Sequence, residues 1–108
     1  MNERKWMIYG ANGFSAMLAI EESVKRGLKP VLAGRSPAIE KIAHEFNLDF
    51  QIFSLSSVNE VASQIKGLTV LANCAGPFSE TAETMIQACI QAKVNYIDIT
   101  GEISVYDY

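Results

Sequence analysis

The sequence predicts an α/β fold in which a doubly wound parallel sheet carries helices on both faces. Short apolar runs, too brief to be helices, alternate along the chain with amphipathic stretches of helical period. Gly, Pro, Asn or Ser residues separate the two kinds of segment, as is typical of turns. Strict alternation predicts parallel strands joined by right-handed crossovers, with five strands and four helices in this chain.

Five short runs are the expected strands. Gly10 ends the first run, and Thr100 with Gly101 ends the last, because such residues favour turns. The third run alternates Phe50 and Ile52 with polar residues before it becomes more apolar. The expected strands are residues 5–9, 30–33, 49–55, 69–73 and 94–99.

The first two helices are marked by their ends as well as by apolar spacing. The first begins at Phe14 and ends at Gly27, a residue type that often follows a helix. The second begins with Ser36 as its cap and Pro37 in its first position, and runs to about Phe46. The apolar stripe expected to bury the first helix comprises Phe14, Met17, Leu18 and Val24.

The third and fourth helices carry similar signals. Ser57 and Glu60 have the spacing of a capping box, which opens the third helix. Ser79 is the expected cap of the fourth helix, and the charge of Lys93 suits its C-terminal end. The apolar face expected for the fourth helix comprises Ala82, Met85, Ile86 and Cys89.

Length and composition limit the classes of function. The chain of 108 residues suits a single domain, residues 1–108, and its 49% hydrophobic content is enough for a core. A net charge of −3 without a basic cluster argues against a nucleic-acid partner. Cys74 and Cys89 lack CxxC spacing, and the single His44 has no partner at metal-ligand spacing, so neither a disulfide nor a metal site is expected. The first apolar run is too short for a signal peptide or a membrane span, and we expect a cytoplasmic protein.

The loop after the first strand has the pattern GxxGxxA. Gly10 and Gly13 permit a tight turn and a close approach of backbone to a pyrophosphate, while Ala16 allows the following helix to pack closely on the sheet. The helix that starts at Phe14 offers free N–H groups to an anion. Gly10, Asn12, Gly13 and Phe14 are therefore candidate dinucleotide-binding residues, the alternative being glycines that merely form a turn.

The end of the second strand bears on which dinucleotide is bound. Domains that bind NAD usually carry an Asp or Glu there for the ribose hydroxyls, whereas this chain has Arg35 and Ser36 after Gly34. The guanidinium fork of Arg35, with the Ser36 hydroxyl, suits a 2′-phosphate. NADP(H) is accordingly the preferred cofactor and NAD the alternative; the other interpretation of Arg35 is a solvated surface residue.

The loop after the fourth strand places small residues where a doubly wound sheet opens. Ala75, Gly76 and Pro77 are candidates to lie against the ribose and nicotinamide of the cofactor, the alternative being an ordinary turn. Cys74 fits a small buried apolar residue better than a nucleophile. Tyr96 lacks the Lys four residues later that a YxxxK dyad requires.

The last expected strand is followed by acidic and hydroxyl side chains. Asp98, Thr100 and Glu102 fall near the same rim, where a carboxylate could act as an acid or a base. The simpler interpretation is a backbone hydrogen bond for Asp98 and solvation for Glu102. No catalytic residue is assigned.

Four motifs together resemble the amino-terminal NADP-binding domain, of Rossmann type, of the saccharopine dehydrogenase-like oxidoreductases, a family that includes the trans-acting enoyl reductases. They are YGANGFSA at residues 9–16, LAGRS at 32–36, NCAGPFS at 73–79 and YIDITGE at 96–102. The glycine loop of the family is commonly GATGFTG, so Asn12, Ser15 and Ala16 are departures, all small or polar enough to keep the turn.

The resemblance implies an NAD(P)H-dependent oxidoreductase that performs hydride transfer. In the family a later domain completes the substrate pocket, so we expect a fragment truncated before its substrate domain. Family substrates range from amino-acid adducts to enoyl groups of acyl chains, and the substrate therefore stays open. Two alternatives remain: a nucleotide-sensing regulatory domain without turnover, similar to short-chain dehydrogenases, and a doubly wound domain that binds no dinucleotide.

Overall fold

A computed structural model describes residues 5–11, 13–74 and 78–98 and confirms the predicted architecture. Strands and helices alternate along the whole described chain, and all pairs of neighbouring strands are parallel. The strands are β1 (Trp6–Tyr9), β2 (Val31–Gly34), β3 (Phe50–Ile52), β4 (Val70–Asn73) and β5 (Asn95–Asp98). The helices are α1 (Phe14–Lys25), α2 (Ala38–Phe46), α3 (Val58–Ile65) and α4 (Phe78–Ala92).

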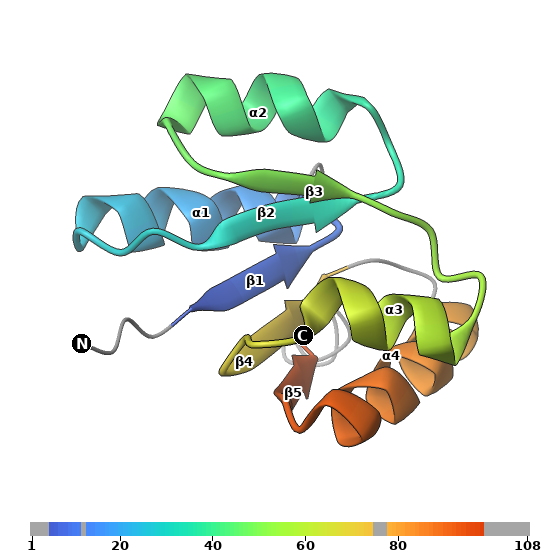
Figure 1. Cartoon of the computed structure of the whole chain (residues 1–108). Coiled ribbons are helices and arrows are strands. Elements are labelled where there is room, and N and C mark those ends of the chain that lie inside the picture. Colours follow the sequence, from blue (N-terminus) through green and yellow to red (C-terminus); the bar gives the residue numbers. More distant parts are fainter. Residues whose placement is uncertain (1–4, 12, 75–77, 99–108) are drawn as a thin grey trace, which may run out of the picture.

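The sheet has the strand order β3-β2-β1-β4-β5, so the chain reverses its direction of travel between β1 and β4. Helices α1 and α2 lie on one face, and α3 and α4 lie on the other (Figure 1). The alternation of side chains along β1 divides the core accordingly. Ile8 packs in the cluster on the α1 side, whereas Met7 and Tyr9 pack in the cluster on the α4 side.

Helix α1 buries a different set of residues from the predicted stripe. Leu18 is 51% exposed, and Met17 and Val24 are only partly buried. The side chain of Phe14 lies outside the described residues. Small residues let α1 approach the sheet closely, and a larger Leu is left at its margin. Among the residues of α1 whose side chains are described, the buried ones are Ala16, Ile20 and Ser23.

Helix α4 also departs from its expected face and start. Met85 and Cys89 are buried as expected, but Ile86 is 38% exposed and Ala88 is buried in its place. The helix begins at Phe78, so Ser79 lies inside its first turn and is not the cap. The predictions that Ile86 is buried and that Ser79 is the cap were therefore wrong.

The other helix starts lie close to the predicted ones, although Pro37 occupies the N-cap position of α2 and not its first helical position. The Ala38 N–H donates to the Ser36 hydroxyl at 3.1 Å, although α2 itself begins one residue after Pro37. The Glu60 N–H donates to the Ser57 hydroxyl at 3.2 Å, which is one half of the predicted capping box. The Glu60 carboxylate accepts from the Ser56 hydroxyl at 3.0 Å.

Candidate functional site

The carboxyl ends of β1 and β4 form the point where the strand order reverses. Tyr9, the last residue of β1, pairs with Ala33 on one side and with Asn73 on the other. The chain leaves β1 toward α1 and leaves β4 toward α4, which lie on opposite faces of the sheet (Figure 1). Diverging loops leave a crevice at such an edge, and ligands of doubly wound folds bind there.

The turn after β1 is fixed by backbone hydrogen bonds. The N–H groups of Gly10 and Ala11 both donate to the Ala33 carbonyl, at 2.8 and 3.1 Å, and the Gly13 N–H donates to the Gly10 carbonyl at 3.0 Å. Gly10 has a φ of 83°, a conformation that disfavours residues with a Cβ atom. The tight turn expected at Gly10 is present.

Gly13 precedes α1 and has no such backbone requirement, because its φ is −89°. A Cβ atom built there would lie 3.4 Å from the Gly10 carbonyl oxygen and 4.0 Å from the Cys74 carbonyl oxygen, which are ordinary contacts. Neither strain nor packing among the described residues therefore explains a glycine at this position. Close approach of a ligand to the backbone is another physical reason for a glycine at such a position.

The N-terminus of α1 is suited to an anion. Gly13, the residue before it, has no side chain to cap it, and its first turn contains no acidic residue. The N–H groups at the start of a helix carry a partial positive charge and need acceptors. Ala16 is fully buried against Ile8 and Cys74, so the close helix–sheet packing predicted for this alanine is confirmed.

Arg35 follows β2 at the same edge of the sheet and is exposed. The ion pairs found among the described residues are Arg26–Glu22 and His44–Glu40, so neither of them engages Arg35. The Ser36 hydroxyl accepts the Ala38 N–H and can still donate its own proton. Both groups are therefore placed to meet an anionic ligand beyond β2.

Sequence reasoning missed Tyr9. Its hydroxyl donates to the Phe53 carbonyl at 2.7 Å inside the core, and the two rings lie 5.0 Å apart. Burial raises the pKa of the Tyr9 phenol from its usual value of 10.0, and the nearby Arg35 guanidinium lowers it to a smaller extent. The only signal in the sequence is a tyrosine at the last position of a buried strand.

The end of β4 is buried and polar. Asn73 is 0% exposed, and its amide donates to the Tyr96 hydroxyl at 3.1 Å. Cys74 is 6% exposed and donates its N–H to the Tyr9 carbonyl at 2.8 Å, which agrees with the small buried residue expected there.

Several candidate residues cannot be compared with the structure. Asn12, Ala75, Gly76 and Pro77 lie outside the described residues, as do Thr100 and Glu102. The side chains of Phe14 and Asp98 are likewise not described. Their proposed contacts stay predictions.

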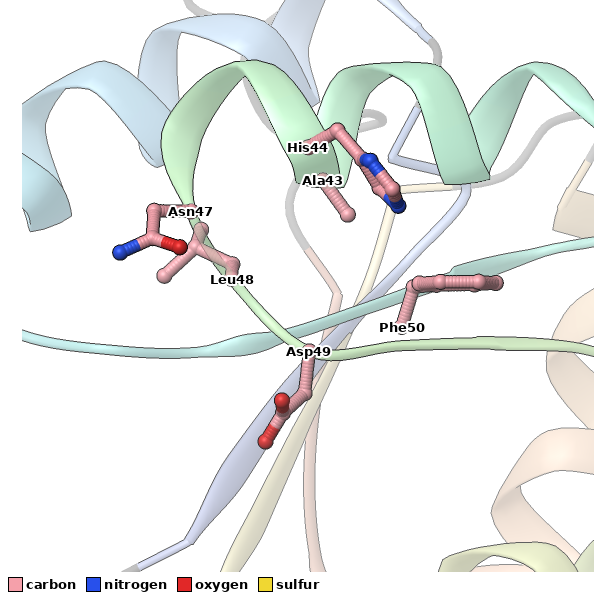
Figure 2. Close-up of a pocket in the computed structure, with 6 residues that line it drawn as sticks. All are labelled: Ala43, His44, Asn47, Leu48, Asp49 and Phe50. Carbon is pink, nitrogen blue, oxygen red and sulfur yellow. The ribbon is translucent and has the colours of Figure 1, made fainter.

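Two surface hollows flank β3 at opposite ends. One, of about 370 Å³, lies at its carboxyl end and is lined by Phe53, Ser54, Ser56, Glu60, Ser63 and Gln64. The other, of about 430 Å³, lies at its amino end, between the end of α2 and the start of β3. Figure 2 shows the Asp49 carboxylate of the second hollow directed away from the His44 ring. Neither hollow is lined by a candidate residue, and the second lies at the amino edge of the sheet, opposite to the edge where ligands of this fold bind.

Neither a membrane-spanning helix nor a metal-binding cluster is found in the described part of the chain. No helix there is both long and apolar enough to cross a bilayer. No group of three or more His, Cys, Asp or Glu side chains gathers there in a way that could hold a metal ion.

Comparison with solved structures supports the fold. Saccharopine dehydrogenase (L-Glu forming) from Saccharomyces cerevisiae superposes with a TM-score of 0.76 at 13% identity, over 89% of this chain and 21% of that one. Vestitone reductase from alfalfa superposes with a TM-score of 0.69 at 18% identity, over 89% of this chain and 36% of that one. At such identities the likeness concerns the fold alone.

Sequence comparison identifies the family. A saccharopine dehydrogenase-like oxidoreductase from Homo sapiens is 29% identical over 119 residues, and a trans-acting enoyl reductase from Mycobacterium ulcerans is 29% identical over 108 residues. The alignments cover 89% and 90% of this chain but only 27% and 25% of those proteins, so the chain spans about a quarter of their length. The family model described as the saccharopine dehydrogenase NADP binding domain matches residues 6–107. The chain therefore belongs to the NADP-binding domain family of the saccharopine dehydrogenases.

Proposed function

We propose that this chain binds NADP(H) for hydride transfer in a longer oxidoreductase. The observation that carries the proposal is the bare N-terminus of α1 at the switch point of the sheet, preceded by Gly13. Among the described residues, a Cβ atom at this glycine would meet only the Gly10 and Cys74 carbonyl oxygens, at 3.4 and 4.0 Å. A pyrophosphate fits this cradle, because it needs backbone N–H donors and a close approach.

The cofactor is expected to extend along the carboxyl edge in both directions. Its pyrophosphate lies on Gly10, Asn12, Gly13 and Phe14, and its nicotinamide near Ala75, Gly76 and Pro77. Its 2′-phosphate meets Arg35 and Ser36 beyond β2. The absence of a carboxylate immediately after β2 supports NADP(H) over NAD, since an acidic side chain there would repel the phosphate.

Bound NADPH supplies the hydride, and the chain supplies its position. The printed names of relatives include saccharopine dehydrogenase-like oxidoreductases and an enoyl reductase, which supports a reducible small molecule or acyl chain as substrate, held by a further domain. These oxidoreductase relatives favour catalysis over the alternative of a nucleotide sensor. A cytoplasmic location and the lack of a nucleic-acid partner stay part of this proposal.

Two substitutions of one glycine test the pyrophosphate cradle. Gly13→Ala adds a Cβ that meets only ordinary contacts among the described residues, and φ is negative, so we expect the backbone to accept a residue with a Cβ atom. The branched Gly13→Val side chain projects further, into the space assigned to phosphate. We expect Gly13→Val to abolish NADPH binding in a fluorescence titration, and Gly13→Ala to weaken it less.

Circular dichroism provides the control for both variants. A native spectrum together with lost binding in Gly13→Val supports the cradle. NADPH binding by natively folded Gly13→Val at the affinity of the unmodified chain would show that the pyrophosphate lies elsewhere.

A further inference from the structure

A buried hydrogen bond connects the end of β1 with the segment that follows β3. Tyr9 is 2% exposed, and its hydroxyl donates to the Phe53 carbonyl at 2.7 Å, across 44 residues of sequence. Strand β2 lies between β1 and β3, and its residue paired with Tyr9 is Ala33. Because Ala33 contributes only a methyl group, the Tyr9 ring has room to reach over β2.

Phe53 is held from two sides. Its carbonyl accepts the Tyr9 hydroxyl, and its N–H donates to the Gly34 carbonyl at 3.0 Å. Phe53 comes directly after the last residue of β3, so this second bond extends the pairing of β2 with β3 beyond the strand itself. Tyr9, Phe53 and Gly34 thus form one chain of hydrogen bonds at the carboxyl edge.

This chain of bonds ends at the residue before Arg35. The Ile39 side chain of α2 packs closely on Gly34, since a Cβ atom built there would lie 2.9 Å from the Ile39 Cδ1 atom. The Arg35 guanidinium is close enough to the Tyr9 phenol to oppose the rise in the pKa of that phenol. Two hydrogen bonds that share Phe53 therefore connect the backbone next to Arg35 with the end of β1.

We propose that Tyr9 is a positioning residue for cofactor specificity: its hydroxyl, acting through Phe53 and Gly34, holds Arg35 where a 2′-phosphate can be bound. The inference rests on the proposed NADP(H) function and assigns Tyr9 no contact with the cofactor. A buried hydroxyl that only supported the fold would affect NADPH and NADH equally. A hydroxyl that positions Arg35 affects NADPH alone, because NADH lacks the 2′-phosphate.

The test is a fluorescence titration of Tyr9→Phe with NADPH and with NADH. Loss of the hydroxyl leaves the buried Phe53 carbonyl without this donor and loosens the segment next to Gly34. We expect NADPH affinity to fall about fivefold and NADH affinity to change less than about twofold. In an Arg35→Ala background, Tyr9→Phe should leave the ratio of the two affinities unchanged, because the group that it positions is gone.

Tyr96→Phe is the matched control. It removes a phenol hydroxyl of the same kind from β5, where this hydroxyl accepts a hydrogen bond from the Asn73 amide. Strand β5 lies on the opposite side of β1 from β2 and Arg35. We expect it to lower the stability of the chain without changing the ratio of NADPH to NADH affinity. Phe53→Leu provides a second route if Tyr9→Phe folds poorly, since it removes only the ring packed on Tyr9 and should lower the same ratio by about twofold.

The outcomes separate this inference from the function on which it rests. Suppose that Arg35→Ala removes the preference for NADPH, whereas Tyr9→Phe and Phe53→Leu both keep it. This result would overturn the role of Tyr9 and leave the role of Arg35 intact. An equal shift of the ratio in Tyr96→Phe would overturn it as well. If the unmodified chain binds neither dinucleotide, the proposed function fails, and the role of Tyr9 fails with it.

Discussion

The buried side chain of Cys89 should make the stability of the fold depend on pH in the alkaline range. It is 1% exposed and packs in the cluster that contains Met85 and Val94. Burial raises the pKa of its thiol from 9.0 to about 11. The native state therefore keeps the proton to a higher pH than the unfolded chain does, and the free energy of unfolding falls as pH rises from 9.0 to about 11.

We expect this loss of stability to be on the order of 2 kcal/mol. Urea denaturation at neutral pH and at the alkaline end of this range measures it. Cys89→Ala is the control: its smaller side chain lowers stability at every pH, but its dependence on alkaline pH should be flatter. Parallel curves for the two proteins would mean that the thiol does not titrate with a raised pKa.

At the residue scale, the sequence identifies Gly10, Gly13 and Arg35 by local patterns around strand ends. Such patterns predict the positive φ of Gly10 and place Arg35 at the end of β2. The role of Tyr9 could not be predicted in this way. Its hydroxyl bonds to a carbonyl 44 residues away, and local sequence does not encode which carbonyl the folded sheet brings near it.

At the element scale, three helices end in the same backbone motif with three different residues. Gly27, Asn47 and Lys93 follow α1, α2 and α4 with positive φ. After α4 the Val94 N–H donates to the Cys89 carbonyl at 2.8 Å, and the Lys93 N–H to the Ile90 carbonyl at 3.3 Å, the pattern of a Schellman motif. Glycine and asparagine suit this conformation, whereas lysine is strained in it.

Lys93→Gly should therefore stabilise the chain by about 1 kcal/mol. Lys93→Ala is the matched control, because it removes the same charge but keeps a Cβ atom at a φ of 63°. The change in the urea midpoint of each variant measures the effect. A gain in Lys93→Ala equal to that in Lys93→Gly would show that the lysine side chain, not backbone strain, is responsible.

Element ends were easier to predict than element faces. The caps at Ser36 and Ser57 act through bonds to nearby backbone, and both are present. The buried face of α1 depends on how closely the sheet approaches, so Ala16 and Ile20 are buried while Leu18 is exposed. Apolar spacing alone cannot show that a small residue will be preferred at a close contact.

At the scale of the whole molecule, alternation of strands and helices was sufficient to predict a doubly wound sheet. The observed order β3-β2-β1-β4-β5 places its switch point between the glycine loop and the end of β4. The candidate residues of two separate motifs, Gly10–Gly13 and Arg35–Ser36, thereby come to one edge. The match covers only 27% of the human relative, so the identity of the substrate does not follow from it.

We expect the carboxyl edge of the sheet to bind NADP(H) and to select it through Arg35. A fluorescence titration with NADPH and NADH, side by side in the unmodified chain and in Arg35→Ala, tests it most directly. We expect NADPH to bind about tenfold or more tightly than NADH, and Arg35→Ala to remove that difference while leaving NADH affinity unchanged. Equal affinities in the unmodified chain would contradict the role of Arg35, and binding of neither dinucleotide would contradict the claim as a whole.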